Sequence, residues 1–253
     1  MGFPPTYGAI ACPSCGKYQY RVEHSGNDVV ICSAYFYSDG WKYAPFFSHL
    51  PRPNFMKCPA CGVFFKVSDS LTRDAKYEVD LSSLVRPRAD GMSNLRDGVS
   101  YLSIKEYRQA INFGLYNSGP EGSEEWKEDM LLLRIELWQS YNHSIGGMEN
   151  ASAEQKAIYE DNCRRILSML TGKTDSEYLL MAELHRNIGE FDKCRNLLNN
   201  INQAGIKYPL IISIIGAACD AMNMLTVRVD DPDIPMLGAI CNPKFSIYTW
   251  AVG

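Results

Sequence analysis

The sequence contains none of the short motifs that identify common classes of enzyme. It has neither the His-Glu-x-x-His pattern of zinc proteases nor the Gly-x-Ser-x-Gly pattern of serine hydrolases. The segment Thr171–Thr174 ends like a phosphate-binding loop, but Leu167 stands where such a loop requires glycine. We therefore expect no enzymatic activity, no catalytic residues and no site for an organic cofactor.

The chain also lacks a long hydrophobic run and a strong charge of either sign. Its longest apolar stretch, Pro209 to Cys219, is far shorter than the about 20 residues that cross a bilayer. A net charge of −4 argues against a general nucleic-acid binder, which must neutralise phosphates. No basic and apolar signal peptide opens the sequence. These absences predict a cytoplasmic protein with no membrane partner and no general affinity for nucleic acid.

Cysteine is the residue that stands out, because the chain has nine. An odd number without a regular pairing pattern is atypical of a secreted disulfide scaffold and indicates a reducing compartment. We expect the cysteines on apolar helix faces to be buried and inert. Five cysteines are scattered without the spacing of metal ligands: Cys32, Cys163, Cys194, Cys219 and Cys241.

The other four cysteines lie in two turns with the same pattern, Cys-Pro-x-Cys-Gly. Proline presets the backbone for a tight turn, and glycine after the second cysteine adopts the left-handed conformation that closes it. Both thiolates of one turn can then reach the same ion. Four thiolates complete a tetrahedral zinc shell with no open position. The sequence therefore predicts one structural zinc ion per chain, bound by Cys12, Cys15, Cys58 and Cys61.

A Cys-x-x-Cys pair can instead be a redox dithiol, as in thioredoxin-like enzymes. Those enzymes place the pair where a strand runs into a helix. Here there are two pairs, and each is followed by β-forming residues, Tyr18 to His24 after the first and Val63 to Val67 after the second. We therefore favour a zinc site over two redox dithiols.

The segment between the two turns is typical of β-strands. Asp39-Gly40 is a strong signal for a two-residue hairpin turn. We interpret residues 1–70 as a zinc ribbon with an inserted β-hairpin. Strands are predicted over residues 18–24, 29–37, 41–43, 55–57 and 63–67.

From Ser103 the hydrophobic period becomes helical. Ser103 and Ser152 each precede a Glu or Gln by three residues, which is the pattern of a capping box. The acidic residues early in the second helix are interpreted as a solvated face rather than a catalytic pair: Glu124, Glu125, Glu128 and Asp129. Six helices are predicted, at about residues 103–116, 123–143, 152–170, 175–189, 190–203 and 208–226.

The fourth and fifth of these helices resemble a tetratricopeptide repeat (TPR). Ala182 and Cys194 occupy the two small positions at which such helices approach each other closely. His185 falls where the repeat usually has an aromatic residue. Only one such unit is visible, whereas stacked arrays need about three. We therefore expect a compact helical bundle that contains one TPR-like hairpin.

As a whole, the chain resembles a group of uncharacterised bacterial proteins that combine an N-terminal two-turn zinc ribbon with TPR-like helices. The resemblance covers roughly residues 10–205 and implies a fold and a metal, but it carries no activity. It rests on the two cysteine turns and on residues 38–40, 133–138, 141–142 and 182–191.

The predicted fold class is α+β, with a small β-rich zinc ribbon followed by a mostly helical TPR-like bundle. The tail ends in an apolar and aromatic run, 245–252, which we expect to pack on the body or on a partner. Four regions are predicted: ribbon 1–70, connector 71–102, helical domain 103–226 and extended tail 227–253.

Three functions are weighed on these grounds. The first is a non-enzymatic, zinc-stabilised protein-interaction protein of the adaptor, scaffold or immunity type. The second is nucleic-acid binding through aromatic faces of the ribbon. The third, with the least support, is an enzyme with an unrecognised site between ribbon and helices. The aromatic residues of the second hypothesis are Tyr18, Tyr20, Tyr35, Phe36, Trp41 and Tyr43.

Overall fold

The computed structural model describes residues 6–23, 35–40, 42–43, 54–74, 95–96, 99–100, 102–143, 148–201 and 210–229. The chain divides into two compact units, and each is discontinuous in sequence. The first unit comprises Met1–Val30 and Phe47–Ser140, and the second comprises Ile31–Phe46 and Tyr141–Gly253. The described residues have an α+β architecture with a mostly helical C-terminal part. The predicted boundaries near residues 70, 102 and 226 stay a prediction.

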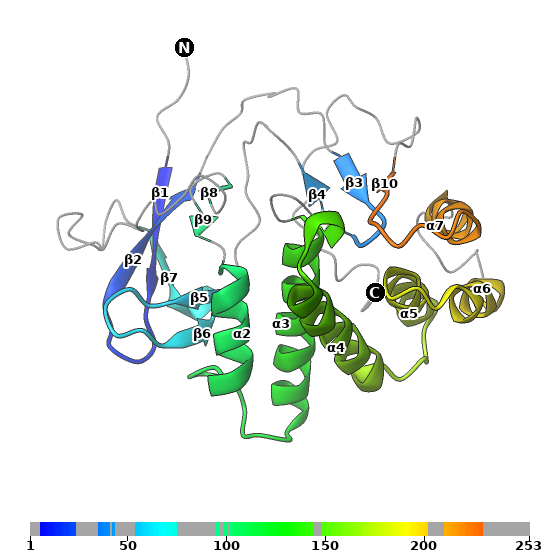
Figure 1. Ribbon diagram of the computed structural model, residues 1–253. Coiled ribbons are helices and arrows are strands. Elements are labelled where there is room, and N and C mark those ends of the chain that lie inside the picture. Colours follow the sequence, from blue (N-terminus) through cyan, green and yellow to red (C-terminus); the bar gives the residue numbers. More distant parts are fainter. Residues whose placement is uncertain are drawn as a thin grey trace, which may run out of the picture. The chain divides into compact units, whose positions relative to one another are not determined.

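The strands of the first unit are short and form three antiparallel sheets, ordered β2–β1–β7, β5–β6 and β8–β9 (Figure 1). The predicted strands after the two cysteine turns are confirmed, whereas β1 was not predicted, and β7, β8 and β9 lie in the predicted connector. The strands are β1 (Thr6–Ala11), β2 (Tyr18–Glu23), β5 (Phe55–Lys57), β6 (Phe64–Lys66), β7 (Thr72–Asp74), β8 (Leu95–Arg96) and β9 (Val99–Ser100).

Among its described residues, the second unit has one sheet, ordered β10–β3–β4. A two-residue turn at Asp39–Gly40 would pair Phe36 with Tyr43, but Phe36 pairs with Lys42. The turn is longer than predicted because Gly40, at φ +78°, donates its N–H to the carbonyl of Tyr37 at 2.9 Å. This is a β-turn that ends in a left-handed glycine. The strands are β3 (Tyr35–Tyr37), β4 (Lys42–Tyr43) and β10 (Arg228–Val229).

The six predicted helices are confirmed. Capping boxes are present at Ser103 and Ser152, as expected. The fourth helix is capped by Thr174 rather than by Asp175, since the Thr174 hydroxyl accepts the N–H of Glu177 at 3.1 Å. Within the described ranges, no helix is both long and apolar enough to cross a membrane. The helices are α2 (Ile104–Phe113), α3 (Glu124–Asn142), α4 (Ala153–Met169), α5 (Asp175–Asn187), α6 (Phe191–Asn199) and α7 (Leu210–Asp220).

Helix α7 ends earlier than the predicted residue 226. Met222 has a left-handed backbone with φ 51°, and its N–H and that of Asn223 close the helix on the carbonyls of Cys219 and Ala218. The chain then enters β10, which lies at the start of the predicted tail. The predicted apolar run at 245–252, like residues 29–34 of the predicted strand 29–37, lies outside the described residues.

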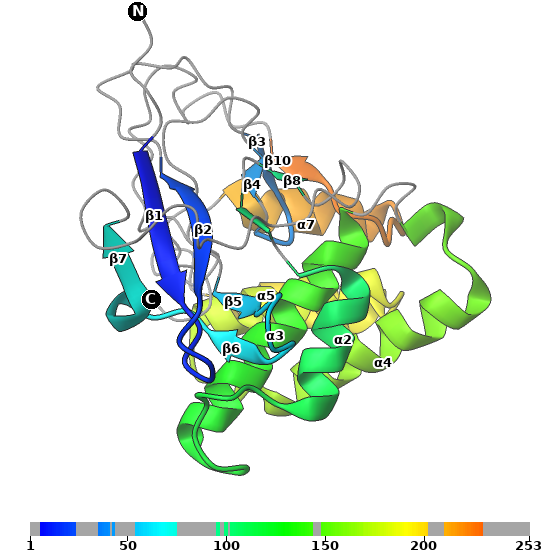
Figure 2. The ribbon, with the colours of Figure 1, turned by 90° about the vertical axis from the view of Figure 1, so that its left-hand side faces the viewer.

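In the first unit, α2 and α3 form an antiparallel pair, and β5 and β6 lie beside α2 (Figures 1 and 2). The carbonyl of Phe64 in β6 accepts the N–H of Tyr116 at 2.9 Å, just after α2. Lys66 exchanges two hydrogen bonds of 2.8 Å with the side-chain amide of Asn117. The strands of the second cysteine turn are therefore joined to the helices by backbone hydrogen bonds.

The core of the second unit lies among α5, α6 and α7. Ala182 and Cys194, the small residues of the TPR-like pattern, are both completely buried in it. A short connector at Gly189, with φ +78°, joins α5 to α6. The other buried members of this cluster are Leu179, Ile201, Ile211, Ile212, Ile215 and Cys219.

Candidate metal centre

The two Cys-Pro-x-Cys-Gly segments fold into turns with the same hydrogen bond. In the first turn, the Gly16 N–H donates to the carbonyl of Cys12 at 2.9 Å, and in the second the Gly62 N–H donates to that of Cys58 at 2.7 Å. The two glycines have φ values of +71° and +78°. The predicted left-handed glycines are thus confirmed. The first turn connects β1 to β2 and the second connects β5 to β6 (Figure 2).

The turns bring their four thiols to one point. The sulfur atoms of Cys12 and Cys61 are 3.7 Å apart, and so are those of Cys15 and Cys58. All four sulfurs lie within 4.8 Å of one another. A tetrahedral ion with metal–sulfur bonds of about 2.3 Å requires sulfur–sulfur distances of about 3.8 Å. The four predicted ligands are therefore arranged to bind one metal ion.

The four thiols differ in their surroundings. Cys12 and Cys58 are buried, whereas Cys15 and Cys61 are exposed. Burial raises the pKa of Cys12 to about 12 and also raises the pKa of Cys58. A hydrogen bond from the backbone N–H of Val63 lowers the pKa of Cys61 to about 7. Buried thiols with raised pKa values require a bound cation to ionise at neutral pH, and a metal ion at the centre of the cluster would supply that positive charge.

The same residues pack the core of this region. The buried members of the cluster are Ile10, Cys12, Met56, Cys58 and Phe65. Two of the four candidate metal ligands are thus also core residues. The metal would consequently stabilise the hydrophobic cluster and the two hairpins together.

Comparisons with known protein families, with curated proteins and with solved structures found no match to this chain. Support for the four-cysteine centre therefore comes from the geometry of its sulfur atoms. Membership of the bacterial group that the sequence resembles stays a prediction.

The segment that ends like a phosphate-binding loop is occupied by the protein itself. One oxygen of the Glu177 carboxylate accepts the hydroxyl of Thr171 at 2.9 Å and the N–H of Lys173 at 2.8 Å. These hydrogen bonds lower the pKa of Glu177, although its partial burial alone would raise it. An internal carboxylate thus takes the place that a phosphate would need, in agreement with the absence of the first glycine.

The acidic residues at the start of α3 differ in their exposure. Glu124, Glu125 and Glu128 are exposed, as predicted for a solvated face. Asp129 differs, because its side chain is buried. Its carboxylate lies 2.6 Å from the Lys66 ammonium and accepts the hydroxyl of Ser118 at 2.8 Å. Asp129 therefore connects α3 to β6 within the first unit.

Three of the scattered cysteines behave as predicted. Cys163, Cys194 and Cys219 are buried, and burial raises the pKa values of Cys163 and Cys194. Cys32 and Cys241 lie outside the described residues. Of the aromatic residues considered for nucleic-acid stacking, the structure describes the side chain of Tyr18 only. It does not describe the side chains of Tyr20, Tyr35, Phe36, Trp41 and Tyr43.

His185, which takes the aromatic position of the TPR-like pattern, pairs with Glu190. The His185 Nδ1 atom is 2.6 Å from the carboxylate, which also contacts Arg164 and Lys193 at 3.0 Å. Partial burial alone would raise the pKa of Glu190, but the hydrogen bonds from Lys193, His185 and Arg164 lower it to about 2. One carboxylate thus joins α4, α5 and α6, and His185 contributes to structure.

His143 has an acidic partner that the sequence did not suggest. Its Nε2 atom lies 2.9 Å from Asp39, whose side chain is fully buried in the hairpin turn after β3. Asp39 also accepts the Asn142 side-chain amide at 2.9 Å, and the ring of Tyr37 packs edge-on against His143. The Asp-Gly signal predicted a turn but not a buried carboxylate. This pair fixes the turn to the end of α3.

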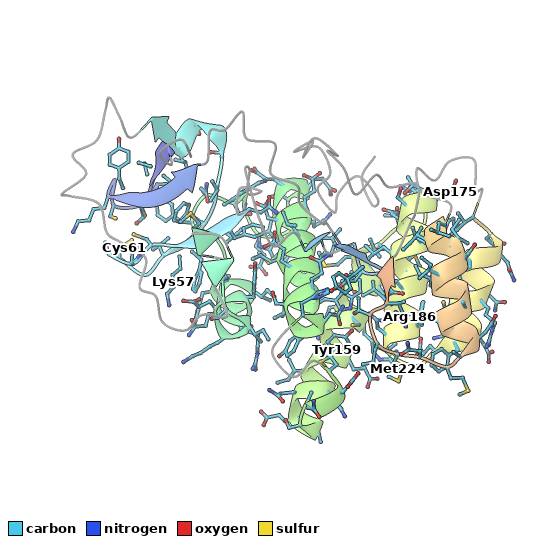
Figure 3. The ribbon with its side chains drawn as sticks, turned by 90° about the horizontal axis from the view of Figure 1, so that it is seen from above. Lys57, Cys61, Tyr159, Asp175, Arg186 and Met224 are labelled. Carbon is cyan, nitrogen blue, oxygen red and sulfur yellow. The ribbon has the colours of Figure 1, made fainter. Side chains whose placement is uncertain are left out.

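Sequence reasoning also missed a buried ion pair in α5. Arg186 has no exposed side-chain surface, and Glu183 has 2%. The guanidinium donates to both carboxylate oxygens, at 2.7 Å and 2.5 Å. It also donates to the carbonyls of Asn223 and Leu225, between α7 and β10. Figure 3 shows Arg186 close to this segment, which includes Met224.

Polar side chains extend this ion pair to the β-hairpin and to α4. Ser38 donates to Glu183 at 2.6 Å and accepts the N–H of Val227 at 2.9 Å. On the other side, the hydroxyl of Tyr159 lies 3.2 Å from the side-chain oxygen of Asn187. The network therefore joins the β3–β4 turn, α4, α5 and the segment before β10. Four of its members, Ser38, Glu183, Arg186 and Asn187, lie in the segments 38–40 and 182–191 that carried the resemblance.

Glu136, on α3 in the first unit, is a carboxylic acid with an unusual environment. Its two oxygens accept hydrogen bonds from Asn54 at 2.5 Å and Tyr107 at 2.8 Å. Loss of solvation raises its pKa to about 7, and these two hydrogen bonds offset only part of that effect. Because the folded-state pKa is higher than the unfolded-state value near 4.5, the protonated Glu136 carboxyl contributes fully to stability below pH 4.5. This contribution decreases as the pH rises above 4.5 and is lost once the pH has passed through 7.

Replacing Glu136 by glutamine is therefore expected to stabilise the protein above pH 7 by roughly 1–3 kcal/mol, with a smaller effect at pH 6 and little effect near pH 4.5. The amide keeps the shape of the side chain but carries no charge. Thermal unfolding of the zinc-loaded protein at several pH values measures this difference. Glu106→Gln is the control, because hydrogen bonds from Ser103 and the charge of Lys57 lower the pKa of Glu106. A Glu136→Gln effect that is the same at pH 6 and pH 8.5 would contradict the assignment.

Proposed function

We propose that this protein is a non-enzymatic, zinc-stabilised protein-interaction protein of the adaptor, scaffold or immunity type. The observation that carries the proposal is the set of four sulfur atoms within 4.8 Å of one another. Four protein thiolates fill the tetrahedral shell of zinc and leave no position for water or substrate. A closed site of this kind stabilises a fold rather than performing a reaction.

Zinc is the metal that such a site favours. Thiolates are soft ligands, and a tetrahedral set of four selects zinc or iron–sulfur chemistry. The two tight hairpins, β1–β2 and β5–β6, offer both cysteines of each turn to one ion, which is the arrangement expected of a zinc ribbon. We assign the two hairpins to a zinc ribbon on this basis.

The helices of the second unit support a binding role. The complete burial of Ala182 and Cys194 fits the close approach of a TPR-like helix pair. In the part of the chain that the structure describes, Asp129, His143 and His185 all have internal partners. They serve the structure in this account, and we propose no catalytic role for them.

An exposed aromatic pair provides a place for a partner. Phe113, at the end of α2, is 79% exposed, and Tyr116 is 58% exposed. The backbone of Tyr116 is bonded to Phe64 in β6, the strand that follows the second cysteine turn. The aromatic pair and the metal centre thus belong to the same unit. Aromatic side chains held on a rigid backbone are common anchors at protein interfaces.

Affinity capture from a bacterial lysate, followed by mass spectrometry, tests the proposal. Zinc-loaded wild type should retain a partner that the double variant Phe113→Ser, Tyr116→Ser loses. Met222→Ser is the matched control, because Met222 is 69% exposed but lies in the second unit. The control should retain the partner, and isothermal titration with the purified partner should give the same ranking. Equal retention by all three proteins would contradict the proposed surface.

A further inference from the structure

Each exposed sulfur of the metal centre lies beside a buried sulfur of the other turn. Cys61 is exposed and its sulfur is 3.7 Å from that of buried Cys12 (Figure 3). Cys15 is exposed and its sulfur is 3.7 Å from that of buried Cys58. Both of these 3.7 Å contacts cross between the turns and join an accessible atom to an inaccessible one.

This arrangement has a chemical consequence for oxidation. Peroxides react with thiolates that solvent can reach, and the resulting sulfenic acid condenses with a neighbouring thiol to form a disulfide. Coordination to a metal keeps a cysteine in the thiolate form. The exposed cysteines thus combine thiolate character with access, and each has a resolving cysteine within 4 Å.

We propose that the four-cysteine centre is a peroxide-sensitive modification site, at which an exposed cysteine is oxidised and then forms a disulfide with the buried cysteine of the opposite turn, releasing the zinc ion. This inference rests on the zinc part of the proposed function. The products are a Cys12–Cys61 or a Cys15–Cys58 disulfide, and not a disulfide within either turn.

The reaction balances with hydrogen peroxide as the only oxidant. The Cys61 thiolate attacks one peroxide oxygen, the O–O bond breaks, and with one proton the products are a sulfenic acid and water. The Cys12 thiolate then attacks the Cys61 sulfur, and the hydroxyl leaves as a second water after accepting a proton. Two thiolates lose two electrons, which the peroxide accepts. Zinc retains two thiolate ligands, too few for a stable structural site.

The remaining described cysteines do not offer this reactivity. Cys163, Cys194 and Cys219 are buried, and burial keeps the first two as neutral thiols. Loss of zinc would also loosen the hairpin that is bonded to Tyr116. Binding of the proposed partner is therefore expected to fall on oxidation and to return when a thiol reductant and zinc are added.

The test uses the full-length, zinc-loaded protein and hydrogen peroxide. Zinc content is measured first. A protein that contains no zinc would refute the proposed function itself, before its oxidation is tested. A chromogenic chelator then follows zinc release, and mass spectrometry of unreduced peptides identifies the disulfides. We expect one zinc released for each first disulfide formed, and that disulfide to be Cys12–Cys61 or Cys15–Cys58. Disulfides within the turns, or zinc retained while other cysteines are oxidised, would overturn the inference.

Histidine variants separate the exposed from the buried ligands, because zinc also accepts mixed cysteine and histidine shells. The double variant Cys15→His, Cys61→His should release zinc about tenfold more slowly than wild type. Cys12→His removes the resolving partner of Cys61, so a sulfenic acid at Cys61 should become trappable with dimedone. Equal release rates for wild type and a zinc-loaded double variant would overturn the inference. If the variants bind no zinc, the wild-type disulfide map decides it.

Discussion

Replacing Cys58 by serine is expected to abolish stoichiometric zinc binding and to unfold the two cysteine hairpins. Cys58 is completely buried, and its sulfur lies 3.7 Å from that of Cys15. Structural zinc contributes about 10–16 kcal/mol in small zinc-binding peptides, which is as large as the whole stability of a typical domain. Metal analysis and limited proteolysis measure the loss, and new cleavage sites are expected within residues 6–74.

The matched control is Cys194→Ala. Cys194 is equally buried, but it lies in the helical core of the second unit, where alanine fits the small position. This variant should keep one zinc ion per chain and its resistance to proteases in the N-terminal region. A Cys58→Ser protein with full zinc content and unchanged proteolysis would show that the turns do not form a metal site.

The second large effect is expected from Arg186→Met. The guanidinium is fully buried and bonded to Glu183 and to two backbone carbonyls. Removing it leaves a buried carboxylate without a countercharge, which costs about 3–5 kcal/mol. The segment between α7 and β10 also loses its donors. Chemical denaturation of the zinc-saturated protein, followed by circular dichroism, measures the change.

Two further variants separate the charge effect from a loss of packing. Arg195→Met removes a partly exposed arginine that pairs with Asp192 and Asp220, and it should change the stability much less than Arg186→Met. The double variant Arg186→Met, Glu183→Leu should be more stable than Arg186→Met alone, because no unpaired charge remains. An Arg186→Met protein no less stable than Arg195→Met would refute the role of the network.

The local features of the fold could be predicted from the sequence because their causes are local. The turns of Cys12–Gly16 and Cys58–Gly62 depend on residues next to one another, and the same is true of the capping boxes at Ser103 and Ser152. The pairing of the two cysteine turns followed from the valence of zinc. The structure places the sulfur atoms of the four predicted ligands within 4.8 Å of one another.

The buried polar network could not be predicted in this way, because its partners are far apart in the chain. Glu183 and Arg186 are three residues apart on a helix, a spacing that usually marks an exposed pair. Arginine is almost never fully buried unless it is paired. Only the contact with Ser38, 145 residues away from Glu183, shows that this pair is internal.

The discontinuous units arise from the same kind of contact. Strand β10 pairs with β3, and Ser38 bonds to both α5 and Val227. The hairpin between the cysteine turns therefore groups with the C-terminal helices, although it lies within the predicted ribbon. Contacts with distant residues also occur after the end of α7, where the carbonyls of Asn223 and Leu225 accept hydrogen bonds from Arg186.

The central claim is that four cysteines form a closed zinc site. X-ray absorption at the zinc edge of the purified wild-type protein tests it most directly. We expect one zinc ion per chain with four sulfur neighbours at about 2.3 Å and no nitrogen or oxygen ligand. A fully folded protein without metal, or a zinc ion with an oxygen neighbour, would contradict the closed site.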